Sequence, residues 1–340
     1  MHSKNYNRAK LNIDFLKVRQ LEELKTLRPF FDLSILYVIT FSLVFASVYI
    51  FKNFSYWIYP IAIFFIAGRQ GAFLQLIHEA SHNLINKNVK INDFYGSWLT
   101  SYFVGVNFRG YREGHNSHHA NTATELEPKS DSEKYRIIDF KNPKIYFLFL
   151  KDLLGLTALQ IFFDYGGENK NEASKTNKNL NKIKFILQMS IIQLIILSLF
   201  KFNIINYILF WLYPAMGPHM FLMRIRGIAE HGLNKQLGRK VINSKEGLYY
   251  TRSFLTNKNS YKFFLTNFLE KSLIGSFYVY YHHEHHLNSK IPYYNLKKFH
   301  DLVYDEVMKN REQIKNYPMY EKGYFSATFK TSYVPEHIVS

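Results

Sequence analysis

Histidine is concentrated at three places in this chain of 340 residues. Eight of the 14 histidines form groups with a spacing of three or four residues: His78 and His82; His115, His118 and His119; and His282, His285 and His286. Residues three and four apart share one face of a helix, and neutral imidazole binds iron, zinc, copper and nickel. The spacing therefore predicts helices that carry metal ligands.

The number of imidazoles indicates more than one metal ion. His231 is a ninth candidate ligand, and one ion takes about four to six ligands. Adjacent histidines point about 100° apart on a helix, so the pairs His118-His119 and His285-His286 could serve two ions. The chain has no cysteine and no carboxylate cluster of matching spacing, which favours redox-active iron over magnesium or calcium. We expect two ions, each with four or five histidines.

The elements that must position these histidines read as membrane helices. The composition is 47% hydrophobic and 18% aromatic, with a formal net charge of +17. The basic residues flank apolar runs instead of forming one folded patch, which argues against a nucleic-acid binder. Four runs are close to the roughly 20 residues that a membrane-spanning helix needs: 33–51, 54–76, 185–200 and 202–223. These runs predict an all-α integral membrane protein with four transmembrane helices in two hairpins.

Shorter segments complete the predicted architecture. Residues 94–108 and 145–163 are apolar but short or interrupted, and we expect interfacial helices there. Residues 168–184 are rich in Asn and Lys and predict a flexible loop. We expect a single domain over 1–340. Its parts are an N-terminal segment (1–32), a transmembrane and interfacial core with the first two histidine groups (33–223), and a histidine-rich cap with the third (224–340).

The distribution of positive charge predicts the topology. The two inter-helix turns carry one lysine each, Lys52 and Lys201, whereas the N-terminus, the central loop and the C-terminal region are rich in Lys and Arg. Because basic residues favour the cytoplasmic side, we expect a multi-pass protein with both termini and the histidine groups in the cytoplasm.

Other polar residues near the histidine groups have competing interpretations. Glu79 and Glu230 precede proposed ligands and could orient them, or could simply be surface residues. His283 lies off the ligand face of its group. Four arginines could bind an anionic headgroup, or could have a topological or structural role instead: Arg109, Arg112, Arg224 and Arg226. The isolated histidines are interpreted as surface or core residues: His2, His219, His300 and His337.

Taken together, the three groups resemble the histidine boxes of the membrane fatty acid desaturase superfamily, which also contains hydroxylases and ketolases. The family pattern is H-x(3–4)-H, H-x-x-H-H and (H/Q)-x-x-H-H, and the resemblance spans roughly residues 35–300. The segment from His282 to His300 looks like the acyl-desaturase form of the third box. His231 looks like the extra ligand after the fourth span. Gly227 stands where some members have a metal-supporting Asn.

The resemblance implies two iron ions (Fe2+/Fe3+), with O2 as cosubstrate. The implied reaction introduces a C=C bond into the acyl chain of an acyl-lipid, acyl-CoA or acyl-carrier substrate, within membrane lipid. The two electrons would come from a separate donor, a ferredoxin or small cytochrome with its reductase, because the sequence has neither cysteine nor a G-x-G-x-x-G loop. A donor of this kind, if acidic, would suit a basic cytoplasmic face.

Three other functions compete with desaturation. A di-iron hydroxylase or ketolase would share the same ligands and differ only after the first hydrogen is removed. His78-Glu79-Ala80-Ser81-His82 also fits the zinc-protease motif H-E-x-x-H, but an intramembrane protease would leave six histidines unused. A metal transporter or sensor would need polar residues within the spans, which are nearly free of them.

Overall fold

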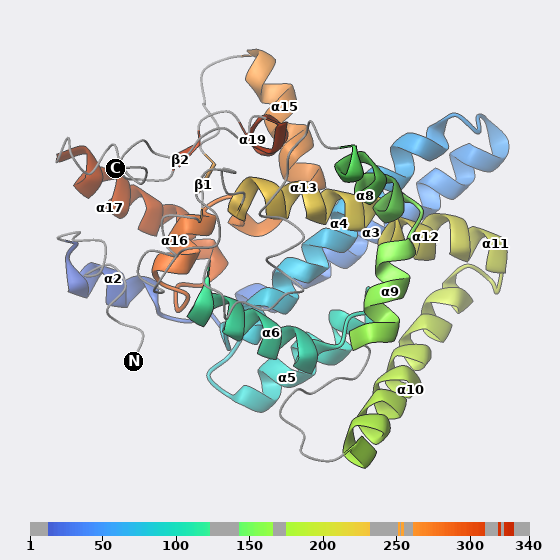
Figure 1. Cartoon of the computed structure of the whole chain (residues 1–340), viewed down its shortest axis with the longest axis horizontal. Coiled ribbons are helices and arrows are strands. Elements are labelled where there is room, and N and C mark those ends of the chain that lie inside the picture. The colour runs from blue at the N-terminus through green and yellow to red at the C-terminus, as the bar shows by residue number, and fades with distance from the viewer. Residues whose placement is uncertain are drawn as a thin grey trace. The chain divides into compact units, whose positions relative to one another are not determined.

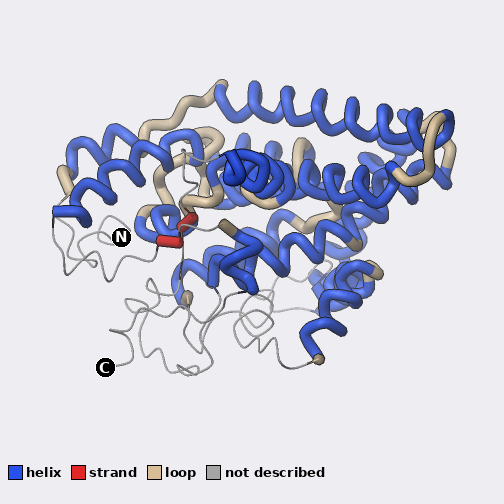
Figure 2. Tube along the Cα trace, turned by 90° about the horizontal axis from the view of Figure 1, so that it is seen from above, coloured by secondary structure: helices blue, strands red, loops and turns tan. Residues whose placement is uncertain are grey.

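The computed structural model describes residues 13–122, 143–165, 175–231, 251, 253–254, 261–309, 319–320 and 323–329. These residues are mostly helical, as Figure 2 shows, and their only sheet pairs two strands of two residues each, β1 (Ser253–Phe254) and β2 (Met319–Tyr320). The all-α prediction is therefore confirmed for the described chain.

The chain divides into two compact units. We call residues 25–115 and 146–223 the hairpin unit, and residues 1–24, 116–145 and 224–340 the histidine unit. The predicted division into an N-terminal segment, a core and a cap remains a prediction.

The hairpin unit contains the helices of membrane-spanning length. α3 (Arg28–Asn53) and α4 (Ile58–Ser81) pack side by side in Figure 1, and α10 spans Lys175–Leu199. Three segments are long and apolar enough to cross a membrane: α3, α4 and the Leu180–Leu199 part of α10. These three correspond to the first three predicted spans. The predicted loop at 168–184 is wrong for residues 175–184, which are helical and belong to α10. Lysine is a good helix former, so the helix extends beyond the apolar run. Residues 168–174 lie outside the described residues.

The fourth predicted span, 202–223, is not one helix. It is divided among four elements: α11 (Ile204–Tyr207), the π-helix η2 (Ile208–Leu212), α12 (Tyr213–Met216) and the start of α13 (Pro218–His231). The last break falls at Gly217, where a Cβ atom would collide with the carbonyl oxygen of Leu153, and Pro218 follows it. Proline and close backbone approach interrupt a helix that the apolar pattern alone would continue.

The predicted interfacial segment 145–163 forms two helices instead of one. α8 (Lys144–Leu153) and α9 (Leu156–Tyr165) are bent by 75°, and together they are apolar enough for a broken span or a re-entrant loop. The bend falls at Gly155, whose φ of +76° suits glycine. The four-helix count therefore stays a prediction, with three continuous helices observed.

Aromatic packing holds the hairpin unit together. Its core contains Val44, Ile66, Phe185, Ile196, Phe210 and Trp211, among others. The rings of Phe41 and Trp211 stack with centroids 5.3 Å apart. Gln70 Nε2 donates a 2.8 Å hydrogen bond to the carbonyl oxygen of Trp211, which satisfies a buried polar group at the π-helix.

The second histidine group lies on a helix that begins in the hairpin unit. α5 (Val89–Trp98) and the short η1 (Ser101–Phe103) lead to α6 (Phe108–Asn121). The Asn107 side chain caps α6 by accepting from the backbone N–H groups of Arg109 and Gly110 at 3.2 and 3.3 Å. Phe108 packs so closely on Gly96 that a Cβ atom at this position would collide with the Phe108 ring.

The histidine unit brings together short helices from distant parts of the chain. Its remaining elements are α2 (Phe15–Leu21), α15 (Tyr261–Leu273), η4 (Ser276–Tyr278), α16 (His282–Leu287), η5 (Tyr293–Asn295), α17 (Leu296–Lys309) and α19 (Tyr324–Phe329). Asn288 and Asn295 donate side-chain hydrogen bonds to Glu22 and to the carbonyl oxygen of Leu21, at 2.9 and 2.8 Å. The N-terminal segment therefore braces the chain that follows α16.

Candidate metal centre

Four histidines from three segments converge in the histidine unit. One nitrogen of each lies within 4.8 Å of those of the other three: His118, His231, His282 and His286. They come from α6, α13 and α16. His118, His282 and His286 are buried, and His231 is half-buried. The Nε2 atoms of His282 and His231 are 2.8 Å apart. We call this set the four-histidine group.

The four-histidine group fits a transition-metal ion. Imidazole nitrogen binds such ions at about 2.0–2.1 Å, so two ligands of one ion lie roughly 3.0–3.4 Å apart. Burial, together with the neighbouring histidines and Arg226, holds the pKa of His282 well below its usual range, and burial has the same effect on the pKa of His286. The neutral form is the one that binds metal.

A second set lies at the junction of α4 and α6 in the hairpin unit. His78, His82 and His115 pack with ring centroids 4.5 to 4.9 Å apart, and the Nε2 atoms of His82 and His115 are 3.0 Å apart. We call these residues the three-histidine group. His78 lies in the last turn of the long apolar helix α4 and is buried.

The two remaining predicted ligands pair with each other. His119 and His285 have their Nε2 atoms 3.0 Å apart, and both belong to the histidine unit. On α6, His119 follows His115 by four residues and therefore shares its face. All nine predicted ligands thus have another predicted ligand as a near neighbour. The assignment of each as a ligand stays a prediction.

Carboxylates contact the outer nitrogens of two ligands. Glu79 Oε1 lies 3.2 Å from Nδ1 of His78, and Glu230 Oε2 lies 3.5 Å from Nδ1 of His282. Carboxylates in this position orient metal-bound imidazoles, and both are buried. Burial raises the pKa of Glu230, while the Arg226 guanidinium, 2.9 Å away, lowers it. The orienting interpretation of Glu79 and Glu230 is thus favoured over a surface role.

A second carboxylate network, which the sequence interpretation missed, supports α16 from behind. Glu284, between the paired histidines of the third box, accepts hydrogen bonds from Ser253 and from His300. Burial would raise the pKa of Glu284, but these donors and nearby His283 lower it to about 2. Nδ1 of His283 lies 2.8 Å from the Thr251 hydroxyl, and His283 is not part of the four-histidine group. The position of Glu284 inside the third histidine box was the sequence feature that could have indicated this network.

The other histidines lie elsewhere. His219 is buried beside Gly71 in the hairpin unit. His2 and His337 lie outside the described residues, and His300 is a core residue, buried and hydrogen-bonded to Glu284.

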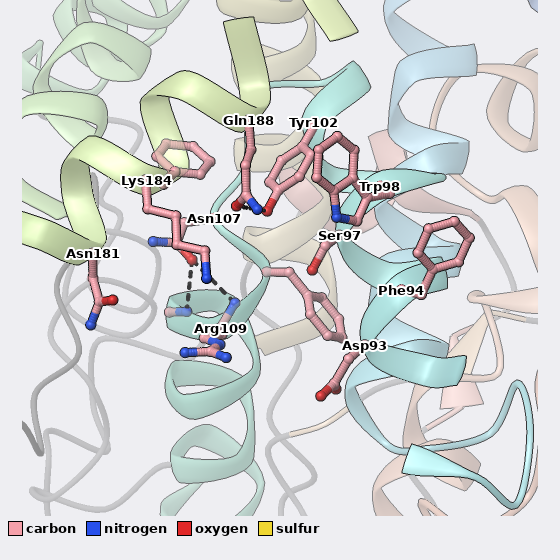
Figure 3. A pocket seen from close by; sticks show the side chains of 13 residues that line it. Asp93, Phe94, Ser97, Trp98, Tyr102, Asn107, Arg109, Asn181, Lys184 and Gln188 are labelled. Atoms are coloured by element: carbon pink, nitrogen blue, oxygen red, sulfur yellow. Dashed lines mark hydrogen bonds between the residues drawn. The ribbon is translucent and has the colours of Figure 1, made fainter. Parts of the chain in front are cut away.

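Of the four headgroup candidates, Arg109 lines a pocket beside α6. Arg112 forms a 2.6 Å ion pair with Asp93 and lies over the Phe108 ring, Arg226 pairs with Glu230, and Arg224 is buried. The pocket has a volume of about 260 Å³. Figure 3 shows Arg109, Asn107 and Lys184 on one side and Phe94 and Trp98 on the other, with Tyr102 hydrogen-bonded to Gln188 between them.

Comparison with known proteins identifies the family. The model of the family described as Fatty acid desaturase matches residues 54–315. The chain belongs to the fatty acid desaturase family. Dihydrorhizobitoxine desaturase from Bradyrhizobium elkanii is 26% identical over 255 residues, which cover 72% of this chain and 67% of the relative. The resemblance to the desaturase superfamily is therefore confirmed.

Membership of the desaturase family makes this protein an oxidoreductase of the desaturase or hydroxylase type. The family implies a di-iron cofactor, and the histidine groups supply donors that would bind such ions. The three long apolar helices in the described part of this chain agree with a membrane protein of this family. The zinc-protease motif at His78–His82 lies within the matched region and contributes to the first histidine group.

Proposed function

We propose that the protein is a membrane-bound, di-iron, O2-dependent desaturase that introduces a double bond into an acyl chain. The observation that carries the proposal is the four-histidine group: imidazole donors from three distant segments, three of them buried, meet within 4.8 Å in a desaturase-family chain. A ligand set made mostly of imidazole suits iron. It does not suit calcium or magnesium, which bind oxygen ligands.

Nine histidines hold the two irons in this proposal. The four-histidine group binds one ion and the three-histidine group contributes to the other, while His119 and His285 complete the set. When bound, the irons supply the O2-derived oxidant that removes hydrogen from an unactivated C–H bond. The overall reaction converts –CH2–CH2– into –CH=CH– and reduces O2 to two water molecules with two electrons and two protons. In this proposal, the protein holds the neutral imidazoles in position and excludes water around them.

The electrons come from a separate carrier in this proposal. The chain has no cysteine for iron–sulfur ligation, and its net charge is +17. An acidic ferredoxin or small cytochrome, with its reductase, is complementary to such a surface. The cytoplasmic position of the histidine groups is proposed on the same charge distribution.

The pocket beside α6 is proposed to hold the polar end of the substrate. Arg109 and Lys184 are both exposed at this pocket, whereas Trp98 and Phe185 supply apolar wall. Basic pockets beside membrane helices bind anionic headgroups. Arg109 precedes His115 by six residues on α6, which is roughly 9 Å along the helix axis. An anionic acyl substrate held at Arg109 would therefore have its chain close to the three-histidine group.

Lipid mass spectrometry tests the function. Cells that express the wild-type chain are compared with cells that express His118→Ala. His219→Ala is the control, because it removes a buried histidine outside the groups. We expect a product two mass units lighter than its precursor with the wild-type chain and with His219→Ala, and no such product with His118→Ala. A gain of sixteen units would establish the hydroxylase alternative. Because the relative is named for dihydrorhizobitoxine, polar small molecules are measured alongside lipids. Peptide cleavage with one zinc per chain would favour the protease alternative.

A further inference from the structure

We propose that the C-terminal segment, beyond the family-matched region, supplies a positioning residue for the four-histidine group. That residue is Tyr324, at the start of α19. The matched region ends at residue 315, so no histidine-box pattern points to it. This inference rests on the proposed function, since it assigns Tyr324 to the support of a metal ligand.

Tyr324 reaches His282 through one carboxylate. Its hydroxyl donates a 3.1 Å hydrogen bond to Oε1 of Glu230, whose Oε2 lies 3.5 Å from Nδ1 of His282. Tyr324, Glu230 and His282 are 2%, 2% and 4% exposed, so water does not compete for these contacts. The hydroxyl and Arg226 approach Glu230 from different segments, and between them they fix the direction of the carboxylate.

The orientation of His282 follows from this arrangement. Its Nδ1 faces Glu230, while its Nε2 faces His231 at 2.8 Å. A carboxylate at Nδ1 keeps the proton on that nitrogen and leaves the Nε2 lone pair for a metal ion. Tyr324 therefore acts on the ligand through Glu230 and does not touch the proposed metal itself.

Three interactions anchor the helix that carries Tyr324. Glu270 accepts hydrogen bonds from the backbone N–H groups of Tyr324 and Phe325, at 3.1 and 3.2 Å. At the other end of α19, the buried Thr328 donates to the carbonyl oxygen of Ile225, on α13, at 2.9 Å. α13 also carries Glu230 and His231. α19 is thus fastened to the helix that presents two parts of the site.

Removal of the Tyr324 hydroxyl tests the proposal by metal binding as well as by activity. Tyr324→Phe keeps the ring and deletes the hydrogen bond from the hydroxyl to Glu230, while Arg226 still donates to that carboxylate. Purified, metal-free protein is titrated with Co2+, whose absorption spectrum reports ligand geometry, and iron-loaded protein is analysed for iron per chain. The expected result is binding of one of two ions weakened by about 10- to 100-fold, with an altered Co2+ spectrum at that site.

Two further variants separate positioning from folding. Tyr146→Phe, at an exposed tyrosine of α8, should leave both ions and the spectrum unchanged. Thr328→Val loosens the docking of α19 without touching Glu230, and should lower the unfolding temperature more than Tyr324→Phe does. If Tyr324→Phe binds two ions with wild-type affinity and spectrum, the inference is overturned while the proposed function stands. If the wild-type protein binds no iron, the proposed function fails and the inference fails with it.

Discussion

Nδ1 of His300 lies 2.5 Å from Oε1 of Glu284, and both residues are buried. The pair joins α17 to α16, the helix of the third histidine box. Ser253 donates to the other carboxylate oxygen, so Glu284 is held from two sides while its neighbours His285 and His286 face the proposed metal ligands.

His300→Ala should destabilise the protein. The change leaves the Glu284 carboxylate buried without its ring partner, and removal of one member of a buried pair costs about 3–5 kcal/mol. Thermal or denaturant unfolding in detergent measures the loss.

A double-mutant cycle provides the control for that measurement. Glu284→Gln should cost less in the His300→Ala background than in the wild type, because the charge that needed the partner is gone. Equal costs in both backgrounds would show that the two side chains do not stabilise one another.

Two histidines three residues apart in the third box, His283 and His286, should differ in metal binding. His286 belongs to the four-histidine group, whereas His283 contacts Thr251. His286→Ala should reduce bound iron from about two ions per chain to about one and lower product formation by more than about 100-fold. His283→Ala should retain both ions. The iron content of the two purified variants tests this prediction. Loss of iron in both variants would contradict the assignment of His286, but not His283, as a ligand.

Charge reversal at the pocket should affect substrate affinity more than turnover. Arg109→Glu with Lys184→Glu places negative charge where an anionic polar end is proposed to bind, so KM should rise by about 10-fold or more with kcat little changed. Lys90→Glu, on an exposed position of α5 outside the pocket, is the matched control. An equal rise in KM for that control would assign the effect to overall charge.

Electron delivery should weaken as salt is added. If an acidic carrier docks on this basic chain, screening at about 0.15 M ionic strength shortens the reach of the attraction to about 8 Å. The rate at limiting carrier should fall between low and physiological salt. The rate with a small uncharged reductant should not. Salt-independent turnover with the protein carrier would argue against electrostatic docking.

Gly323→Ala should detach α19. Gly323 has a φ of +80°, and a Cβ atom there would collide with the Glu270 carboxylate. The left-handed conformation alone costs a non-glycine residue about 1–2 kcal/mol. Gly114→Ala is a suitable comparison, because nothing lies within 4 Å of its added Cβ and alanine favours helix by up to about 1 kcal/mol. The two variants should therefore shift the unfolding temperature in opposite directions.

Local spacing predicted the histidine groups well. His78 and His82 lie one turn apart because α4 stays helical to its end, and the same holds for His115 and His119 on α6. Apolar runs likewise predicted α3 and α4, because a stretch without charge that is long enough to span has few other stable forms.

Features set by tertiary contact escaped prediction. The break at Gly217 depends on the backbone of Leu153, more than sixty positions away, and no local pattern shows such an approach. A surface or core role was predicted for His300, but its partner Glu284 becomes visible only because α17 packs on α16. Tyr324 is 94 positions from Glu230, and nothing in its immediate sequence distinguishes it from the other 25 tyrosines.

The supports of the third box extend past both borders of the matched region 54–315. Leu21 and Glu22 hold the chain after α16, and Tyr324 holds Glu230. A chain trimmed to those borders would keep all nine candidate ligands and lose both braces. Exchange of these flanks between relatives is therefore a route to retune reactivity while every histidine stays in place, and variation among desaturases deserves to be sought outside their shared motifs.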